Sequence, residues 1–488
     1  MAIIIRTDQL DRKASTGNLR EWAYNGLDCA VTLEIVNELR PLLDNISGGT
    51  YGFSRALQAP VLEMSMRGLR VDLERRDRVL GELLADIERM ANDLDEIIRD
   101  GIGTSVSWRS PKQLMELLYG VLKLPPVRKK NANGAMAPTV NRDALERLQT
   151  NYLLAEPICT RLLLLRDLDK QRQFLVSDLD TDGRIRTSIN IAGTNTGRLS
   201  CSISDLGTGA NLQTVDSRLR SIFIADEGME FINVDIEQGD SRNVGAICWN
   251  TFLASHGPEF AGAYLDACES GDLHSTVSRM VWPDKEPAII YYRQDSYRQI
   301  SKKLGHGTVY FGTPRTMAKH SKVDVLVINE FQANFFEKFP AIGVYDKADH
   351  HTDCWHNRVR RALSSGGQIT TMLGRRRYFY GHPKDDETVR AAIAYEPQSL
   401  TADEIDTGML ALWRANIVQL MLQVHDSLLL QGPRGRSAET VPKVLDCLRV
   451  RFDLVGGRTF NVAHGVKIGL NWGDFASNNP LGIAKWHA

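Results

Sequence analysis

The stretch RQISKKLGHGTVYFG, residues 298–312, carries two cations and two rings at a regular spacing. Every fourth position bears one of them, in the order Arg298, Lys302, His306 and Tyr310. Because four residues turn an α-helix slightly past one full turn, these side chains would share one broad stripe. Such a stripe suits a triphosphate at its cationic end and stacked bases at its aromatic end. The spacing alone also fits the solvated face of a surface helix.

Two carboxylates lie on either side of this stretch in the sequence. Asp235 ends an apolar strand in FINVDIEQGDSRNVGA (231–246), and Asp426 lies in LQVHDSLLL (422–430), a predicted β-hairpin with His425 and Asp426 at its turn. A carboxylate in an apolar strand is costly unless it is paired or binds a metal, although either aspartate alone could be a simple turn residue. Two aspartates on neighbouring strands can hold two Mg²⁺ ions about 4 Å apart, while nearby cations neutralise phosphates.

Length, charge and cysteine content limit the classes of protein to which this sequence can belong. With 488 residues the chain exceeds one typical domain. The 59 basic and 60 acidic residues nearly cancel, so any nucleic-acid surface must be a local groove. The seven cysteines form no CxxC pair, which supports neither a zinc site nor a disulfide framework and favours a reduced, intracellular setting. The start MAIIIRTDQLDRK lacks the order and length of a signal peptide, and no segment resembles a membrane span.

Periodicity predicts the remaining elements. Residues 60–100 read as a helix, a turn at Gly68, a short strand and a long amphipathic helix. Residues 101–150 read as loop-rich, with a flexible cationic segment at 127–139. Residues 183–213 are rich in Gly, Ser, Thr and Asn and predict strands and loops, whereas 250–345 are mainly helical.

The order of these motifs resembles DNA polymerase family A, the group of bacterial DNA polymerase I and many phage replicative enzymes. Each motif is weak by itself, but together and in family order they are specific, and the resemblance covers the chain from about residue 55. The matching segments are TNTGRLSCS (194–202) with NLQ (211–213), VDIEQGDSR (234–242, motif A), GDLHSTVS (271–278), residues 298–312 (motif B), PQSLTAD (397–403) and VHDS (424–427, motif C).

The resemblance implies an α+β protein with the right-hand polymerase fold, in which a mixed or antiparallel palm sheet carries helical fingers and a helical thumb. It implies template-directed addition of dNTPs to a primer 3′-hydroxyl by two-metal-ion phosphoryl transfer. The expected parts are an N-terminal segment (1–54, a possible exonuclease remnant), palm entry (55–79), thumb (80–165), palm with motif A (166–249), fingers with motif B (250–385) and palm with motif C (386–488).

The resemblance also implies roles for single residues. Asp235 and Asp426, helped by the backbone carbonyl of Ile236, would bind two Mg²⁺ ions, for which Mn²⁺ can substitute, and Lys302 would protonate the departing pyrophosphate. The residues implied to bind the dNTP are Arg298, Lys302, His306, Tyr310, His274, Asp240 and Gln238. Those implied to contact primer–template DNA are Arg198, Asn211, Gln213, Arg220, Gln398, His425, Lys129 and Lys130. For the two lysines, a solvated surface is the open alternative.

The chain departs from the usual family pattern at several positions. Asp240 stands where the family usually has glutamate, and the lost methylene leads to the hypothesis of weaker discrimination against ribonucleotides. His306 replaces a usual Phe or Tyr, Phe311 is inserted before Gly312, and Ser427 replaces an acidic residue. None of these changes removes a metal-binding aspartate, so activity is expected.

The first 54 residues differ most from the longer relatives. YNGLD (24–28) resembles the last motif of a 3′–5′ exonuclease, but the acidic motifs that should precede it are absent, and a plain helix face is the alternative. We therefore expect no intrinsic proofreading. The expected partners are primer–template DNA, dNTPs and a separate exonuclease or processivity subunit. We expect a monomer of phage type in the cytoplasm of a prokaryotic or phage-infected cell.

Two other functions share part of this pattern. A single-subunit RNA polymerase or primase would also need the metal aspartates and the cationic helix, but the TGRLS, DLHS and PQS segments argue against it. A catalytically silent nucleic-acid-binding scaffold would not need Asp235, Asp426, Arg298 and Lys302 together. Nucleotide choice and metal dependence distinguish these functions.

Overall fold

The computed structural model describes residues 17–131, 134–204 and 209–487. Residues 1–16 lie outside the described part. They include the stretch MAIIIRTDQLDRK, which does not resemble a signal peptide, and the beginning of the predicted 1–54 segment. Within the described ranges, no helix has both the length and the apolar character that crossing a bilayer requires.

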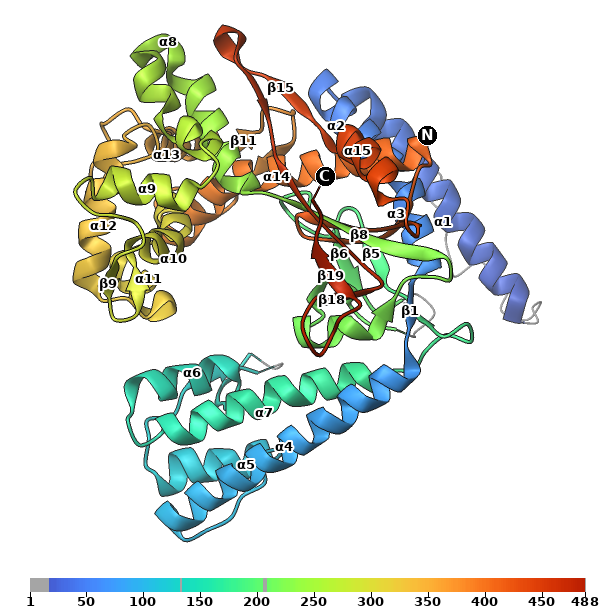
Figure 1. Cartoon of the computed structure of the whole chain (residues 1–488), viewed down its shortest axis with the longest axis vertical. Helices are drawn as coiled ribbons and strands as arrows, with labels where there is room; N and C mark the ends of the chain where they lie inside the picture. Colours follow the sequence, from blue (N-terminus) through green and yellow to red (C-terminus); the bar gives the residue numbers. More distant parts are fainter. Residues whose placement is uncertain (1–16, 132–133, 205–208, 488) are drawn as a thin grey trace.

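A nine-stranded mixed sheet lies at the centre of the molecule (Figure 1). Its pairs are antiparallel except for β18 with β19. In spatial order the strands are β13 (Gln419–Val424), β14 (Ser427–Pro433), β8 (Met229–Ile236), β17 (His464–Gly469), β19 (Gly482–Lys485), β18 (Asn471–Asp474), β7 (Phe223–Ile224), β1 (Leu69–Val71) and β4 (Arg184–Ile185).

Alternation along β8 separates the two faces of this sheet. Ile232, Val234 and Ile236 are buried in a core shared with α3 (Gln58–Arg67), α14 (Asp386–Ala415) and α15 (Ser437–Leu448). Because successive side chains of a strand point to opposite faces, Asn233 and Asp235 are turned the other way. Apolar periodicity therefore places the Asp235 carboxylate on the face that the three helices leave free.

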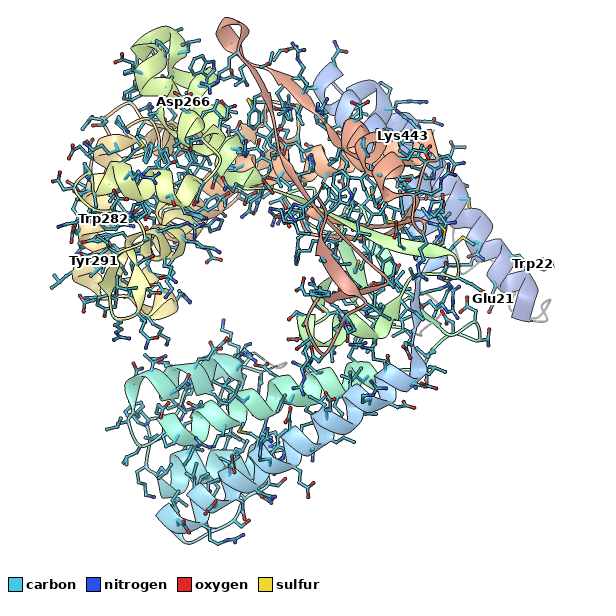
Figure 2. All side chains as sticks on the ribbon, viewed as in Figure 1. Glu21, Trp22, Asp266, Trp282, Tyr291 and Lys443 are labelled. Carbon is cyan, nitrogen blue, oxygen red and sulfur yellow. The ribbon has the colours of Figure 1, made fainter. Side chains whose placement is uncertain are left out.

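A helical bundle and a larger helical body stand on opposite sides of an opening beside the sheet (Figure 1). The bundle contains α4 (Leu73–Ile102), α5 (Pro111–Met115), a π-helix (Glu116–Val121), α6 (Arg142–Asn151) and α7 (Glu156–Leu175). The body contains α8 (Gly239–Glu269), α9 (Leu273–Val281), α10 (Tyr297–Val309), α11 (Pro314–Ser321), α12 (Val325–Lys338) and α13 (Trp355–Ser365). Side chains line the opening from both sides without bridging it in the view of Figure 2.

Short hairpins and two N-terminal helices complete the structure. The hairpins pair β2 (Arg128–Lys130) with β3 (Met136–Pro138), β5 (Ser188–Asn190) with β6 (Ser200–Ser202), β9 (Ile290–Tyr292) with β10 (Asp295–Ser296), β11 (Gln368–Thr370) with β12 (Arg376–Tyr378), and β15 (Arg451–Asp453) with β16 (Thr459–Asn461). Helices α1 (Gly17–Leu39) and α2 (Asn45–Ala56) lie at the outer edge, where the labelled Trp22 is 68% exposed (Figure 2).

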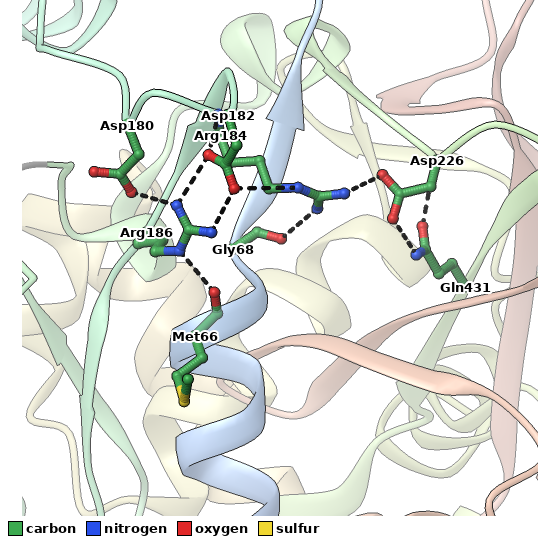
Figure 3. Close-up of polar contacts among 8 residues, drawn as sticks. All are labelled: Met66, Gly68, Asp180, Asp182, Arg184, Arg186, Asp226 and Gln431. Carbon is green, nitrogen blue, oxygen red and sulfur yellow. Dashed lines mark hydrogen bonds and ion pairs between the residues drawn. The ribbon is translucent and has the colours of Figure 1, made fainter.

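Two arginines of the β4 region hold the turn between α3 and β1 against the sheet (Figure 3). Arg184 donates to the carbonyl of Gly68 at 3.2 Å and to the Asp226 carboxylate, while Arg186 donates to the carbonyl of Met66 at 2.6 Å. Gly68 has φ +62°, and a Cβ there would lie 2.7 Å from the carbonyl oxygen of Ile185. The turn that leads into β1 and α4 is therefore held tightly and requires glycine.

The structure differs from two local expectations in the bundle. The cationic segment at 127–139 is not simply flexible, because its described residues pair as the hairpin β2–β3, with Lys129 opposite Ala137. Residues 101–150 contain more helix than their loop-like composition indicated. Helix α6 begins where the Asn141 side chain accepts from the backbone N–H of Ala144 at 3.0 Å, and it buries Leu145 and Leu148.

Candidate active site

Strand register brings the two sequence-predicted aspartates to the same end of the sheet. Asp235 lies on β8 opposite Ser427 of β14, and Asp426 lies in the turn just before Ser427. The backbone N–H of Ile236 donates to the carbonyl of Asp426 at 3.0 Å. His425 makes the tight turn possible by adopting φ +56°, the left-handed region. The hairpin predicted from LQVHDSLLL thus places Asp426 next to the end of β8.

The electrostatics of this pair fit a cation site. Neighbouring atoms that displace water from the Asp235 carboxylate, and then the negative charge of Asp426, raise the pKa of Asp235 to about 6. The residue as a whole still has an exposed surface. A divalent cation between the carboxylates would remove that repulsion. Among the described residues, no three His, Cys, Asp or Glu side chains converge on one metal position. A site of two carboxylates completed by backbone and substrate oxygens matches the preference of Mg²⁺.

Helix α10 contributes Lys302 and His306 of the stripe to a pocket that Asp426 also lines, whereas Asp235, Arg298 and Tyr310 lie outside its lining. A capping box starts α10, since the Ser296 hydroxyl accepts from the N–H of Gln299 and the Gln299 side chain accepts from the N–H of Ser296. The pocket, of about 320 Å³, joins this helix to α8, α9 and the β13–β14 turn. Its polar lining includes Asp426, Lys302, His306, His274, Asp240 and Gln238. The structure therefore gathers most of the predicted nucleotide-binding residues around one cavity.

Arg298 has a partner that the sequence did not indicate. Its guanidinium donates to both carboxylate oxygens of Asp272, at 2.8 and 3.2 Å. Asp272 also caps α9 by accepting from the N–H and the hydroxyl of Ser275. Hydrogen bonding from Arg298, and then from Ser275, holds the pKa of the Asp272 carboxyl far below its usual range. This fork-like pair fixes the direction of Arg298 at the first turn of α10.

The two histidines near the pocket are held in their neutral form. Burial, and then the charge of Arg298, lowers the pKa of His274. Burial also lowers the pKa of His306, whose ring contacts Tyr310 edge to face at a centroid distance of 4.5 Å. Neutral imidazoles can donate one hydrogen bond or stack without adding charge. The positive charge offered by this stripe therefore comes from Arg298 and Lys302.

Tyr310 ends the stripe just outside the helix. Its backbone N–H still bonds to the carbonyl of His306, but α10 ends at Val309 and Phe311 turns the chain with φ +63°. The Tyr310 hydroxyl donates to Oδ2 of Asp240 at 3.0 Å. Burial and then the charge of Asp240 raise the pKa of Tyr310 well above its usual value, so the phenol remains a donor.

Asp240 lies in the first turn of α8, at the junction of several elements. Its Oδ1 accepts from the hydroxyl of Thr401 on α14 at 2.7 Å, and Nη2 of Arg198 lies 3.5 Å from the same oxygen. Thr401 is in the quoted PQSLTAD segment, but nothing in the sequence singled it out as a site residue. The aspartate predicted to face the sugar is therefore held from three sides.

The residues predicted to contact DNA differ in how far their side chains are exposed. His425 is exposed at the turn, and Gln398 is half-buried on α14. Gln213 is buried, and its amide donates to the carbonyls of Leu199 and Gln423, both at 3.2 Å, so it points into the protein. The side chain of Asn211 accepts a hydrogen bond from the backbone N–H of Gln213 at 3.0 Å and thereby caps the short helix that carries Gln213.

Three basic residues predicted to contact DNA lie outside the pocket. The Arg220 guanidinium lies over the Trp472 ring at 4.6 Å. Lys129 and Lys130 are exposed on the β2–β3 hairpin, which lies between the π-helix and α6 of the bundle in the sequence. The structure therefore separates a compact group around the aspartates from basic residues farther away.

Comparisons with known proteins agree with this arrangement. The sequence profile described as DNA polymerase family A matches residues 77–474. DNA polymerase I of Treponema pallidum is 26% identical over 471 residues, which cover 93% of this chain and 43% of that protein. DNA polymerase I of Deinococcus radiodurans is 27% identical over 444 residues, covering 86% of this chain and 42% of that protein. The chain thus spans less than half the length of these curated relatives.

A solved structure supports the fold. The POL domain of Pol1 from M. smegmatis, in complex with a DNA primer-template and dNTP, superposes with a TM-score of 0.66 at 24% identity. The match covers 86% of this chain and 69% of that chain. The α+β class and the right-hand arrangement expected from the sequence are therefore confirmed.

Proposed function

The chain belongs to DNA polymerase family A, and from this premise we propose that it is a template-directed DNA polymerase that adds dNTPs to a primer 3′-hydroxyl. The observation that carries the proposal is the pocket shared by Asp426, Asp240, His274, Lys302 and His306. In the proposal, this cavity combines a carboxylate that would bind metal, a lysine that would bind phosphate and residues that would surround the sugar and base. The similar proteins are DNA polymerases I, and the solved relative was captured with primer-template and dNTP.

Family membership implies a divalent metal in general. We propose that Asp235, Asp426 and the backbone carbonyl of Ile236 hold two Mg²⁺ ions, for which Mn²⁺ can substitute. When bound, such ions activate the attacking hydroxyl and neutralise charge that develops on the phosphoryl group. The raised pKa of Asp235 supports this assignment, because repulsion between the two carboxylates is what a cation would relieve.

The residues predicted to bind the dNTP have complementary roles in the proposal, both those that line the pocket and Arg298 and Tyr310, which lie outside its lining. Arg298, Lys302 and His274 bind the triphosphate, and Lys302 donates a proton to the pyrophosphate leaving group. Tyr310 and His306 contact the base pair by their rings, and Gln238 lines the same pocket. Asp240 excludes the ribose 2′-hydroxyl. A positioned acid and preorganised cations are the usual requirements of phosphoryl transfer.

The proposed DNA contacts lie around the opening. Arg198, Gln398 and His425 would touch the minor groove and the primer end, where acceptors are similar for every base pair. Arg220, Lys129 and Lys130 would contact phosphates. Asn211 and the inward-pointing Gln213 would act indirectly, by shaping the loop after β6. In this scheme residues 80–165 are the thumb, 250–385 the fingers, and the remaining segments from 55 onward the palm.

We propose no intrinsic proofreading for these 488 residues, acting as a monomer, with any exonuclease or processivity subunit being a separate polypeptide. Tyr24 and Asp28, the two residues that resemble an exonuclease motif, lie exposed on α1. The proposed setting is intracellular, where a DNA template is found.

Primer extension tests the function directly. A labelled primer–template is incubated with Mg²⁺ and either dNTPs or rNTPs, using wild type, Asp426→Ala and the matched control Asp446→Ala, whose carboxylate is exposed on α15. We expect dNTP extension by wild type and by the control, and loss of at least about 10³-fold in Asp426→Ala, because a metal ligand of the transition state is removed. Extension with rNTPs alone would favour the RNA polymerase alternative. No extension with either would contradict the proposal.

A further inference from the structure

The Asp240 carboxylate has both oxygens engaged by donors from different parts of the chain. Oδ2 accepts from the Tyr310 hydroxyl at 3.0 Å, and Oδ1 accepts from the Thr401 hydroxyl at 2.7 Å. Tyr310 directly follows α10, whereas Thr401 lies in the middle of α14, behind the sheet. Since aspartate is one methylene shorter than glutamate, a second donor on the α14 side gives the shorter side chain a fixed position.

Thr401 is itself fixed by a buried polar network. It is only 2% exposed, and Nδ2 of Asn243 donates to its hydroxyl oxygen at 3.1 Å. The same Nδ2 lies 3.3 Å from Oε2 of Glu404, one turn along α14. Asn243 and Glu404 are buried as well, at 0% and 4% exposure. Buried polar groups are expensive unless they are hydrogen-bonded. Nδ2 of Asn243 links Thr401 to Glu404 in this way, while Oδ1 of Asn243 and Oε1 of Glu404 are buried without a hydrogen-bond partner among the described residues.

The direction of the Thr401 hydrogen bond follows from its partners. A hydroxyl has one proton, and both Oδ1 of Asp240 at 2.7 Å and the carbonyl of Pro397 at 3.0 Å could accept it. An ionised carboxylate is the stronger acceptor and is also nearer. Asn243 donates to the hydroxyl oxygen and so does not compete for its proton, and the shorter contact directs that proton at Asp240.

Close packing allows this contact. Gly239 precedes Asp240, and a Cβ at Gly239 would lie 3.1 Å from Cγ2 of Thr401 and 2.7 Å from Cγ2 of Ile236. The first turn of α8 is therefore packed tightly against both β8 and α14, with the closer approach to Ile236 of β8.

We propose that Thr401, held by Asn243 and Glu404, is a specificity-determining positioning residue that fixes the Asp240 carboxylate beside Tyr310 and thereby sets discrimination against the ribose 2′-hydroxyl. The inference rests on the proposed polymerase function and on Asp240 facing the sugar. Without the Thr401 hydroxyl, the Asp240 carboxylate retains its contacts with Tyr310 and with the more distant Arg198. It loses the hydrogen bond that fixes Oδ1 and becomes free to rotate away from this position. The space it leaves would accept a 2′-hydroxyl.

Single-nucleotide incorporation kinetics test this proposal. The variants are Thr401→Val, which removes the hydroxyl at nearly constant volume, and Thr401→Ser, which restores it. The matched control is Thr407→Val on the same helix, because the Thr407 hydroxyl donates only to the carbonyl of Asp403 at 2.6 Å. For each protein, kcat and KM are measured with one dNTP and with the corresponding rNTP.

We expect the ratio of dNTP to rNTP kcat/KM to fall about tenfold in Thr401→Val, since a hydrogen bond to a charged group is lost. The change should lie mainly in a lower KM for the rNTP, which general destabilisation would not produce. Thr401→Ser should keep a ratio close to that of wild type, and Thr407→Val should leave it unchanged.

Two results would overturn the proposal. One is an unchanged ratio in Thr401→Val while the wild type extends primers normally. The other is an equal loss of dNTP and rNTP incorporation in a variant whose melting temperature is unchanged. If Thr401→Val fails to fold, Thr401→Ala carries the same expectation with a smaller side chain. A wild type that extends primers with neither nucleotide would instead reject the proposed function, and this inference with it.

Discussion

Asp235 and Asp426 place two negative charges at one end of the sheet, and Asp235 bears an electrostatic cost for it. Its pKa is raised from 3.8 to about 6 by burial and then by Asp426. A carboxyl group with a raised pKa in the folded state binds its proton more tightly there than in the unfolded chain. The free energy of unfolding therefore falls as pH rises from 3.8 to about 6, and the full cost remains at neutral pH.

Replacing Asp235 with Asn should therefore stabilise the metal-free protein. We expect Asp235→Asn to raise the melting temperature at neutral pH by about 1–2 °C, a modest effect because solvent screens the partly exposed site. Thermal unfolding in the presence of a chelator measures this. Millimolar Mg²⁺ should then raise the melting temperature of wild type but not of Asp235→Asn, because ligand binding stabilises only the protein that binds it.

The control for this measurement is Asp446→Asn, whose side chain is 79% exposed. It should match wild type with and without Mg²⁺. A melting temperature of Asp235→Asn below that of wild type in the chelator would contradict the assignment of Asp235 as an electrostatically strained ligand.

Among the elements, α14 is unusual because it buries several carboxylates. Asp403 forms an ion pair with Arg375 at 2.6 Å, whereas Glu404 and Asp406 have no ion pair among the described residues. Burial raises the pKa values of Glu404 and Asp406 well above the ordinary range and that of Glu396 to about 8. At neutral pH these groups are held mainly as neutral acids, which can occupy a helix packed behind the active site.

Glu396 offers a test of this property of α14. Its raised pKa means that the native state binds a proton more tightly than the unfolded chain, so stability falls as pH rises from 4.5 to about 8. In Glu396→Gln, the slope of unfolding free energy against pH in this interval should flatten by up to about 1.4 kcal/mol per pH unit. Urea denaturation at several pH values measures the slope.

The comparison needs a second variant, because other groups titrate in the same interval. Glu387→Gln removes an exposed carboxylate from the first turn of the same helix and should keep the wild-type slope. Equal slopes for Glu396→Gln and wild type would show that Glu396 titrates normally and that α14 tolerates its charge.

At the scale of the whole molecule, the bundle and the helical body face each other across the opening beside the sheet (Figure 1), and we expect the DNA duplex to lie there. The net charge of −1 gives no general attraction to DNA, so binding must depend on locally placed basic residues. Lys129 and Lys130 lie on the bundle side, in a hairpin whose pairing gives them a defined position.

Removing both lysines should reduce the salt dependence of DNA binding. Each lost phosphate contact lowers the slope of log K against log salt by about 0.9, so Lys129→Ala/Lys130→Ala should lower it by about 1–2. Fluorescence anisotropy with a labelled primer–template over a range of salt concentrations measures the slope. Affinity should fall similarly for different sequences, because phosphate contacts carry no sequence information.

The matched control removes two basic residues from the outer surface of the molecule. The double variant Arg436→Ala/Lys443→Ala removes two ion-pair partners of Glu439. Arg436 lies just before α15, and Lys443, labelled in Figure 2, lies on this helix. The salt slope of this variant should equal that of wild type. An unchanged slope in the Lys129 and Lys130 variant would instead favour the solvated-surface interpretation of these lysines.

The sequence by itself predicted the parts of this protein whose pattern is local. The apolar strand that ends at Asp235, the hairpin around Asp426 and the four-residue spacing of α10 are features of short segments, and the structure contains each element. Local periodicity determines which face of a strand or helix a side chain occupies, so both aspartates and the cationic stripe could be found without coordinates. The order of the motifs then identified the family.

Only the tertiary structure decided which distant residues meet. Thr401 reaches Asp240 across 161 positions, Asp272 holds Arg298, and Gln213 turns inward to Gln423, although no short-range pattern marks these contacts. Such contacts depend on how helices and strands pack against one another, because packing selects one of many pairings that the same local structure permits. The sequence thus predicted the chemical groups of the candidate site, while packing determined how each of them is held.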